Sequence, residues 1–421
     1  MKNFFRTIGF CVTIILLCSC TNEKRINRLE PLSSSKGNYN LDLLVSEDSI
    51  NDIKFNEAKD LYVINIPLKP NYSKLDTIFS SYKFIPLETS KECIIGNVTK
   101  IISCDNCFCI LDRDNKNAFI FEKDGRFRCK LGDKGHGPKE HIDAWNIAYN
   151  KEKGSIALLD LSGRKLQHFD LYGNFLLEQP LYLLFTDLAY IDEELVLYTG
   201  TSYNTFSDIF DLYQFVVVNE NLKPISRGCK TTNRLRQEFS YSGVFKKCDN
   251  KVLYDDLLSD TIWILNRTHK TPFVVMEIEG KHVLNQYEKA HMTDYLYQNR
   301  VNKETNVINW YITSKYISMI YHSPKSGGPV QNLIYSRESK LSRIIGFNNN
   351  PKRLGDYLAK AGIDGVFSDN TFLKIVQPAS ILEAVNHLEI KKNLTTKEKK
   401  MIRDLSIDNN PVIMIEQLME F

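Results

Sequence analysis

The sequence reads FCILD at Phe108–Asp112, AFIFE at Ala118–Glu122 and KDG at Lys123–Gly125. The same order returns downstream, as IALLD at Ile156–Asp160, KLQHFD at Lys165–Asp170 and LYG at Leu171–Gly173. Three pairs of landmarks are each 48 residues apart: Asp112 and Asp160, Phe121 and Phe169, and Gly125 and Gly173. A repeat of this length with several short strands per copy predicts the blades of a β-propeller.

Strand patterns extend this repeat along the chain. Val98–Ile102 and Phe127–Leu131 are the expected inner and outer strands of the first clear blade, and Ile142–Gln179 forms the second. Asn221, a further 48 residues beyond Gly173, marks a probable third copy. Strands of the third, fourth and fifth blades are expected at Leu195–Tyr198, Phe215–Val218, Gly243–Phe245, Val252–Tyr254, Thr261–Leu265, Trp310–Ile312, Tyr316–Tyr321 and Gln331–Tyr335.

Asp112 and Asp160 recur at one position of the repeat. Recurrence in successive blades favours a structural role over a catalytic one. We expect each aspartate to end its strand and to accept hydrogen bonds from the amides of the following turn.

The last third of the chain departs from the repeat. Helices are expected within 351–361 and 378–388, and Thr395–Glu398 resembles a helix start. A short helical insertion is also expected at Asn285–Arg300, which lacks strand alternation. The final apolar strand, Pro411–Ile415, can pair with N-terminal strands in one blade and so close the ring. The expected fold class is all-β, a six-bladed β-propeller with short helical insertions near the C-terminus.

The N-terminus has the pattern of an export signal. Lys2 and Arg6 precede an apolar run, Ile8–Leu17, that is too short to span a bilayer. Cys20 follows Leu17-Cys18-Ser19, which looks like the lipidation site of a bacterial lipoprotein. The alternatives are an ordinary secretory signal and a short membrane anchor. We therefore expect a signal peptide at 1–19, a polar tether at 20–60 and the propeller domain at 61–421, with Cys20 lipid-attached and the protein in the cell envelope at the outer membrane.

The amino-acid composition limits the classes of partner that we expect for the protein. The 54 basic and 51 acidic residues leave a net charge of only +3, so no strong field attracts nucleic acid. Hydrophobic content of 43% is that of a folded globular protein.

Several segments together support a named resemblance. They are Phe84–Thr89, Ile95-Gly96, Lys100-Ile101, Ile110–Asp112, Phe121–Gly125, Gly132–Pro138 and Asp408–Ile413. This set resembles the six-bladed β-propeller lipoproteins of anaerobic Gram-negative bacteria, a family related to NHL-repeat propellers. The resemblance implies a fold and an envelope location. It implies no common activity, so it carries over no catalytic residue.

The glycine-rich segment Gly132–His141 is the best candidate for a binding surface. Its glycines and lysine suggest a phosphate-binding loop, but the strand–loop–helix context of such loops is missing. The alternative is a connector between blades, in which glycines serve the turns. Connectors of this kind open onto one face of the ring. His136, Lys139, Glu140 and His141 are therefore the expected ligand-binding residues.

Cys104, Cys107, Cys109 and Cys129 raise the question of a metal site. Zinc requires four ligands that converge as a tetrahedron. The first two cysteines flank a hairpin turn and the others lie on strands, which suits that geometry poorly. Buried free thiols are the main expectation, with a Cys104–Cys107 disulfide as an alternative. No metal and no cofactor are expected.

No nucleophile elbow, zinc-protease helix or paired-carboxylate motif occurs in the sequence. We therefore expect no catalytic residue. The expected function is non-enzymatic: a binding or scaffolding module for a glycan, a peptide or an outer-membrane protein partner. The alternative is a propeller enzyme, a lyase or lactone hydrolase, with acid/base or metal residues at the channel mouth.

Overall fold

The computed structural model describes residues 45–421 except 59, 200–203, 205–206, 231–242, 256–259, 280–305, 323–329, 346–350 and 360–361. The helical insertion expected at 285–300 and the lipidation site at Cys20 lie outside the described residues. No helix in the described ranges combines the length and the apolar character that crossing a membrane requires.

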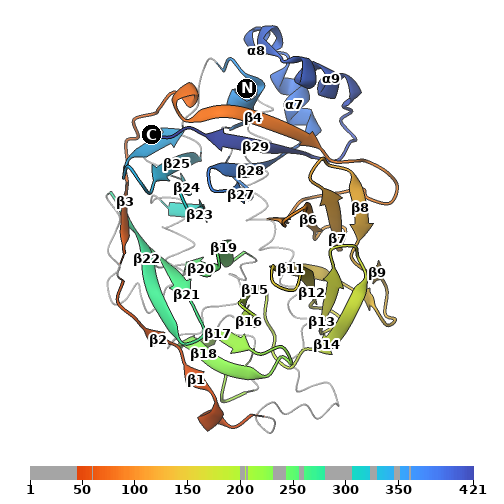
Figure 1. Ribbon diagram of the computed structural model, residues 1–421, viewed down its shortest axis with the longest axis vertical. Helices are drawn as coiled ribbons and strands as arrows, with labels where there is room; N and C mark the ends of the chain where they lie inside the picture. The colour runs from red at the N-terminus through yellow and green to blue at the C-terminus, as the bar shows by residue number, and fades with distance from the viewer. Residues whose placement is uncertain are drawn as a thin grey trace, which may run out of the picture.

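Six antiparallel sheets are arranged as the blades of a ring (Figure 1), which confirms the expected fold. The chain builds the first two blades in order from inner to outer strand. Their strands are β5 (Lys100–Ser103), β6 (Cys107–Asp112), β7 (Asn117–Glu122) and β8 (Phe127–Lys130), followed by β11 (Ala144–Asn150), β12 (Ser155–Asp160), β13 (Lys165–Asp170) and β14 (Phe175–Pro180). Two short connector strands, β9 (Asp133–Lys134) and β10 (Glu140–His141), lie between the two blades in sequence.

The next three blades follow the same plan, and their strands overlap the segments expected from sequence, although the first strand of the fourth blade begins only at Phe245, the last residue of the segment expected at Gly243–Phe245. The third holds β15 (Asp187–Ile191), β16 (Glu194–Tyr198), β17 (Tyr213–Val218) and β18 (Pro224–Lys230). The fourth holds β19 (Phe245–Cys248), β20 (Lys251–Asp255), β21 (Thr261–Leu265) and β22 (His269–Ile278). The fifth holds β23 (Asn306–Ile312), β24 (Tyr316–His322), β25 (Gln331–Ser336) and β26 (Ser342–Ile345).

The sixth blade joins the two ends of the domain. Its strands are β27 (Gly365–Ser368), β28 (Thr371–Val376), β29 (Val412–Leu418) and β4 (Phe79–Pro86). The C-terminal strand β29 pairs antiparallel with β28 on one side and with β4 on the other, so an N-terminal strand forms the outer edge. Figure 1 shows β4 and β29 side by side. This confirms the closing role expected for the final strand.

A single buried asparagine fastens this closure. The Asn410 side chain accepts a hydrogen bond from the Ile95 amide at 2.8 Å and donates to the carbonyls of Glu88 and Cys93, both at 2.6 Å. Asn410 therefore ties the start of β29 to the loop that leads from β4 into the first blade. The side-chain oxygen and the side-chain NH₂ group of Asn410 thus both form hydrogen bonds at the junction between the two chain ends.

The recurrent aspartates have the structural role expected of them. Asp112 accepts hydrogen bonds from the amides of Gly96 at 2.6 Å and of Asn115 at 3.1 Å. Asp160 does the same with Ile142 at 2.9 Å and Gly163 at 2.8 Å. Each carboxylate thus joins the turn after its own strand to the segment that enters the same blade. Both aspartates are fully buried, which makes these bonds costly to lose.

In the third blade, the spacing of the repeat differs from the expected 48 residues. Gly125 and Gly173 have positive φ angles of 94° and 83°, and the equivalent residue in the third blade is Leu222, with φ of 56°. Asn219 caps this turn through the amides of Asn221 and Lys223, as Asp170 caps the second-blade turn. The spacing is therefore 49 residues, and Asn221 is not the turn position. One extra residue between the blades is enough to shift the register.

An N-terminal segment lies along the outer edges of three blades. Strand β1 (Asn51–Asp52) pairs parallel with β18, and β2 (Lys54–Phe55) and β3 (Tyr62–Ile66) pair parallel with β22. Tyr72 then forms a parallel bridge with Ile344 beside the fifth blade. The end of the segment expected to be a tether, 45–58, therefore contacts the propeller. These extra strands also cover sheet edges that would otherwise be exposed.

The helices lie between the strands of the sixth blade and in the approach to it. They are α6 (Leu354–Leu358), α7 (Pro378–Ala384), α8 (Leu388–Asn393) and α9 (Thr396–Asp404), with short 3-10 turns η2 (Glu47–Ser49) and η3 (Leu75–Thr77) near the N-terminus. The expected helix start at Thr395–Glu398 is confirmed, and Thr395 and Glu398 form a capping box at the start of α9. Figure 1 shows α7, α8 and α9 on the outside of the ring beside β4.

Replacing Asn410 tests the closure. We expect Asn410→Ala to lower the free energy of unfolding by about 2 to 4 kcal/mol, because it removes three hydrogen bonds and takes the partner from the buried Ile95 amide and the buried Cys93 carbonyl. Chemical denaturation followed by tryptophan fluorescence measures this. The matched control is Asn221→Ala in an exposed turn, for which we expect a change below about 0.5 kcal/mol. Equal effects of the two substitutions would contradict the role of Asn410.

Candidate functional site

The connector between the first two blades is compact because its residues contact one another. Gly132 has a φ of 68°, and a side chain there would meet Phe169, His141 and the Lys139 carbonyl at 3.1 to 3.2 Å. At Gly135 a Cβ atom would clash with the Glu140 carboxylate. That carboxylate accepts a hydrogen bond from the Gly137 amide at 2.8 Å. The glycines are therefore required by close packing inside the connector.

The four residues expected to bind a ligand lie in different environments. His136 and Lys139 are exposed, Glu140 is half-buried and His141 is fully buried. The imidazole Nε2 of His141 lies 3.0 Å from the Lys116 carbonyl, and burial lowers its pKa. His141 thus holds the connector against the turn between β6 and β7. Of the four residues, only Glu140 lines the groove described next.

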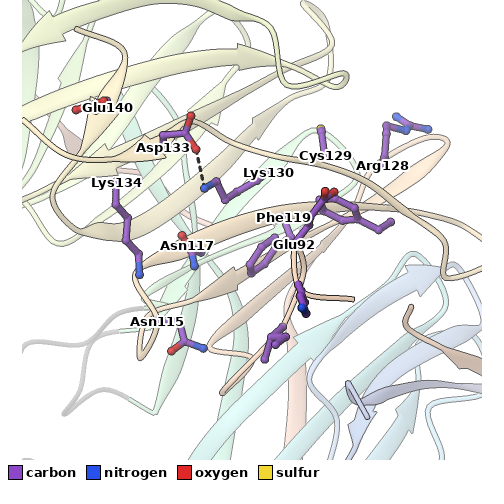
Figure 2. A pocket seen from close by; sticks show the side chains of 13 residues that line it. Glu92, Asn115, Asn117, Phe119, Arg128, Cys129, Lys130, Asp133, Lys134 and Glu140 are labelled. Carbon is purple, nitrogen blue, oxygen red and sulfur yellow. Dashed lines mark ion pairs between the residues drawn. The ribbon is translucent and has the colours of Figure 1, made fainter. Parts of the chain in front are cut away.

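An open groove with a volume of about 1080 Å³ lies beside the outer part of the first blade (Figure 2). Four segments form it: the loop after β4, the turn and strand around β7, the outer strand β8, and the connector. All four segments lie between residues 91 and 140, and the folding of the blade brings them together. The lining residues are Lys91, Glu92, Ile94, Asn115, Asn117, Phe119, Phe127, Arg128, Cys129, Lys130, Asp133, Lys134 and Glu140.

Several of the charged groups in the groove are held by neighbours. Lys130 pairs with Asp133 at 2.7 Å, shown by the dashed line in Figure 2, and Arg128 pairs with Glu122 at 2.8 Å. Arg128 also donates to the Leu171 carbonyl at 3.0 Å, which fixes its direction across the junction of the two blades. These pairs keep charged groups of both signs at set positions along the groove.

Two features leave the groove able to accept a ligand. The carbonyl oxygen of the Asn117 side chain is buried and has no hydrogen-bond partner among the described residues. The exposed Lys91 and Lys134 stand at the groove without an ion pair in the described part of the chain. A ligand with hydrogen-bond donors and acidic groups would satisfy both.

The groove is better suited to binding than to covalent chemistry. Its single lining cysteine, Cys129, has its pKa raised to about 11 by burial, so its thiol is protonated at neutral pH. A protonated thiol is a poor nucleophile. Amide, aromatic and charged side chains and the aliphatic Ile94 make up the rest of the lining.

Polar side chains on the inner strands join neighbouring blades across the ring. Lys100 donates to Asn146 at 2.9 Å, and Asn146 donates to the fully buried Asp187 at 2.9 Å. The other Asp187 oxygen accepts from the Phe245 amide at 2.9 Å. This chain of bonds runs from the first blade to the fourth. Sequence patterns did not predict this chain of hydrogen bonds, because each of its four residues lies in a different blade.

A second inner cluster joins the fourth and fifth blades. Lys246 donates to the Asn309 side chain and, at 2.6 Å, to the Trp310 carbonyl. Burial lowers the pKa of Lys246 to about 8, and burial raises the pKa of Asp255. Burial thereby brings the pKa values of both groups closer to neutral pH.

The seven cysteines in the described part of the chain are free thiols, and all but Cys129 and Cys229 are buried, in line with the main expectation. A hydrogen bond between the thiols of Cys104 and Cys107 raises the pKa of Cys104 and lowers the pKa of Cys107. Within the described ranges, no three His, Cys, Asp or Glu side chains come together as metal ligands.

Comparison with known proteins places this six-bladed propeller in a defined family. A family profile described as "Domain of unknown function (DUF4934)" matches residues 61–417. The chain therefore belongs to the DUF4934 family. The comparison with curated proteins gave no match.

Solved structures support the fold. A putative exported protein from Bacteroides fragilis shares 17% identity with a TM-score of 0.69, covering 86% of this chain and 100% of its own. A member of the DUF4221 family from Bacteroides vulgatus shares 7% identity with a TM-score of 0.46, covering 81% and 97%. The first similarity shows the fold, and the second is too distant to support an argument.

His168 gives the blade interface a pH dependence. Its Nε2 lies 3.1 Å from the Gln179 side chain, and burial lowers its pKa from 6.5 to about 4. The unfolded chain thus binds a proton more tightly than the folded chain, so stability from this residue is complete above pH 6.5 and is lost as pH falls toward 4. We expect a loss of about 2 to 3 kcal/mol across this range.

Denaturation curves at several pH values for wild type and His168→Gln measure this contribution. The glutamine variant keeps a polar partner for Gln179 but does not titrate, so its stability should fall less steeply with acid. Parallel pH profiles for the two proteins would contradict the assignment.

Proposed function

We propose that this protein is a non-enzymatic binding module of the cell envelope, lipid-anchored through Cys20, with the groove beside the first blade as its binding surface. The observation that carries the proposal is the groove itself: an open volume of about 1080 Å³ beside a closed, rigid ring. A rigid ring lets surface loops vary without disturbing the core, which suits recognition.

The groove favours a polypeptide segment of a partner envelope protein as its occupant. Its volume is at the upper end of the range for small-molecule pockets and it is open along its length, so a chain fits it better than a compact ligand. Charges of both signs and the unpartnered side-chain oxygen of Asn117 match a peptide, whose backbone supplies donors and acceptors. A glycan is the other candidate, because Phe127 and the asparagine amides could contact a sugar ring.

The lipid anchor is supported by sequence. The run Ile8–Leu17 followed by Cys20 has the form of a lipoprotein signal, and a solved structure with this fold comes from a protein named as exported. Attached lipid chains would give stable membrane anchoring. These observations support the proposal that the protein is exported and anchored at the outer membrane.

A propeller enzyme is the second candidate, favoured by Lys246 and Asp255. Burial moves the pKa of the lysine down and that of the aspartate up, a pattern that catalytic acid/base pairs use. Turnover of a lactone or a uronic-acid polysaccharide, lost in Lys246→Met, would favour this function over the binding module.

Groove variants test the binding proposal. We expect peptide arrays to show sequences, enriched in acidic residues, that bind wild type at least tenfold better than Lys91→Glu/Lys134→Glu, because the double substitution reverses the two unpaired cations. Lys223→Glu, an exposed lysine outside the groove, is the matched control. Binding on a glycan array alone would assign the groove to sugars. Array binding that the double variant retains would contradict the site.

Metabolic labelling tests the anchor. We expect a palmitate analogue to label wild type in a native host and not Cys20→Ser, which should be released from the membrane fraction. Absence of label on wild type would remove the lipid anchor from the proposal.

A further inference from the structure

A second pocket lies on the opposite face of the ring from the groove. The inner strands β11, β15 and β19 of three neighbouring blades end there, and the hairpin turns that follow them surround a cavity of about 300 Å³. The groove, by contrast, adjoins the connector that leads into the start of β11. The two sites are therefore separate.

Four charged side chains surround this pocket: Lys151, Glu152, Asp192 and Lys247. None of them makes an ion pair within 4.0 Å in the described part of the chain, although both signs are present in one small volume. Two positive and two negative charges leave no net charge, so the pocket does not favour a simple anion or a simple cation. The pocket instead provides separate positions for one anionic group and one cationic group.

All four side chains are exposed, and Lys247 lies on β19, one of the three inner strands that end at the pocket. Desolvation by the surrounding protein lowers the pKa of Lys247. Asp192 and Glu152 act on it from a distance and favour its charged form. A carboxylate placed against the ammonium group would supply the close partner that the described residues do not.

The wall of the pocket is held in place by neighbouring contacts. Tyr190 is buried, and its hydroxyl lies 3.4 Å from the Nδ1 atom of His168. The side-chain oxygen of Asn150, also buried, accepts a hydrogen bond from the Lys153 amide at 3.0 Å. These contacts fix the polar wall without using the four charged groups.

We propose that this pocket binds a small zwitterion, a free amino acid or a dipeptide, with its carboxylate against Lys247 and its ammonium group against Asp192 and Glu152. The volume is at the lower limit for small-molecule sites, which excludes a polymer lying across it. A zwitterion satisfies both signs of charge at once, whereas a neutral sugar satisfies neither. The groove takes no part in binding the zwitterion. The inference is therefore independent of the proposed function.

Calorimetric titration of the full chain in detergent at low ionic strength tests the proposal. The probes are alanylalanine, N-acetyl-alanylalanine and alanylalanine amide. We expect the free dipeptide to bind and each blocked form to bind at least tenfold more weakly, because each lacks one charge. Comparison of the three probes uses only wild-type protein, so it does not depend on the folding of any variant.

Two substitutions assign the charges within the pocket. Lys247→Met and Asp192→Asn should each weaken dipeptide binding at least fivefold, and asparagine tolerates the φ of 52° at position 192. Lys223→Met, outside the pocket, should leave binding unchanged. Equal binding of free and blocked dipeptides, binding of N-acetylglucosamine in place of the dipeptide, or full binding by Lys247→Met would each overturn the proposal.

Discussion

The pairing of β29 with β4 is the interaction on which the rest of the structure depends. A ring of sheets has no natural end, and an open ring would expose the edges of the two terminal blades. Here the last strand of the chain is inserted between β28 and an N-terminal strand, and the buried Asn410 fastens the junction to the loop before the first blade. The N-terminal segment then covers the outer edges of the third and fourth blades with parallel strands. Closure therefore fixes the positions of the blades that shape both the groove and the smaller pocket.

Buried polar groups give the ring its internal order. Asp112 and Asp160 organise single blades, whereas the Lys100–Asn146–Asp187 chain connects successive blades near the axis. Such groups are costly to bury unless every bond is made, so they favour one arrangement of the blades. The same interblade bonding occupies Lys100, Asn146 and Asp187 on the inner strands. Among the described residues, the groove and the smaller pocket are two surfaces that remain open to a ligand, and the groove carries our proposal of a binding function.

Local patterns predicted most of the fold, because blades are built from neighbouring strands. The repeat of Asp112 and Asp160, the capping box at Thr395 and the closing strand were all visible in sequence, and the structure confirms them. The 49-residue spacing to Leu222 was missed because the third-blade turn has leucine where the others have glycine. The groove could be predicted only in part. Glu140 lies in it, but its other walls come from segments near 91, 117 and 128, which only the assembled blade brings together. The parallel strand β1 was missed because two residues carry no periodicity.

If closure through β29 holds the ring together, this strand can open only when the whole domain unfolds. Native-state hydrogen exchange measures this directly, by comparing the amides of β29 with those of β12 in the second blade. We predict that both strands exchange with the free energy of global unfolding, because the loss of β29 would open the ring. Exchange of β29 at a free energy several kcal/mol lower, with β12 still protected, would show that the ring persists without its closing strand and would contradict the account.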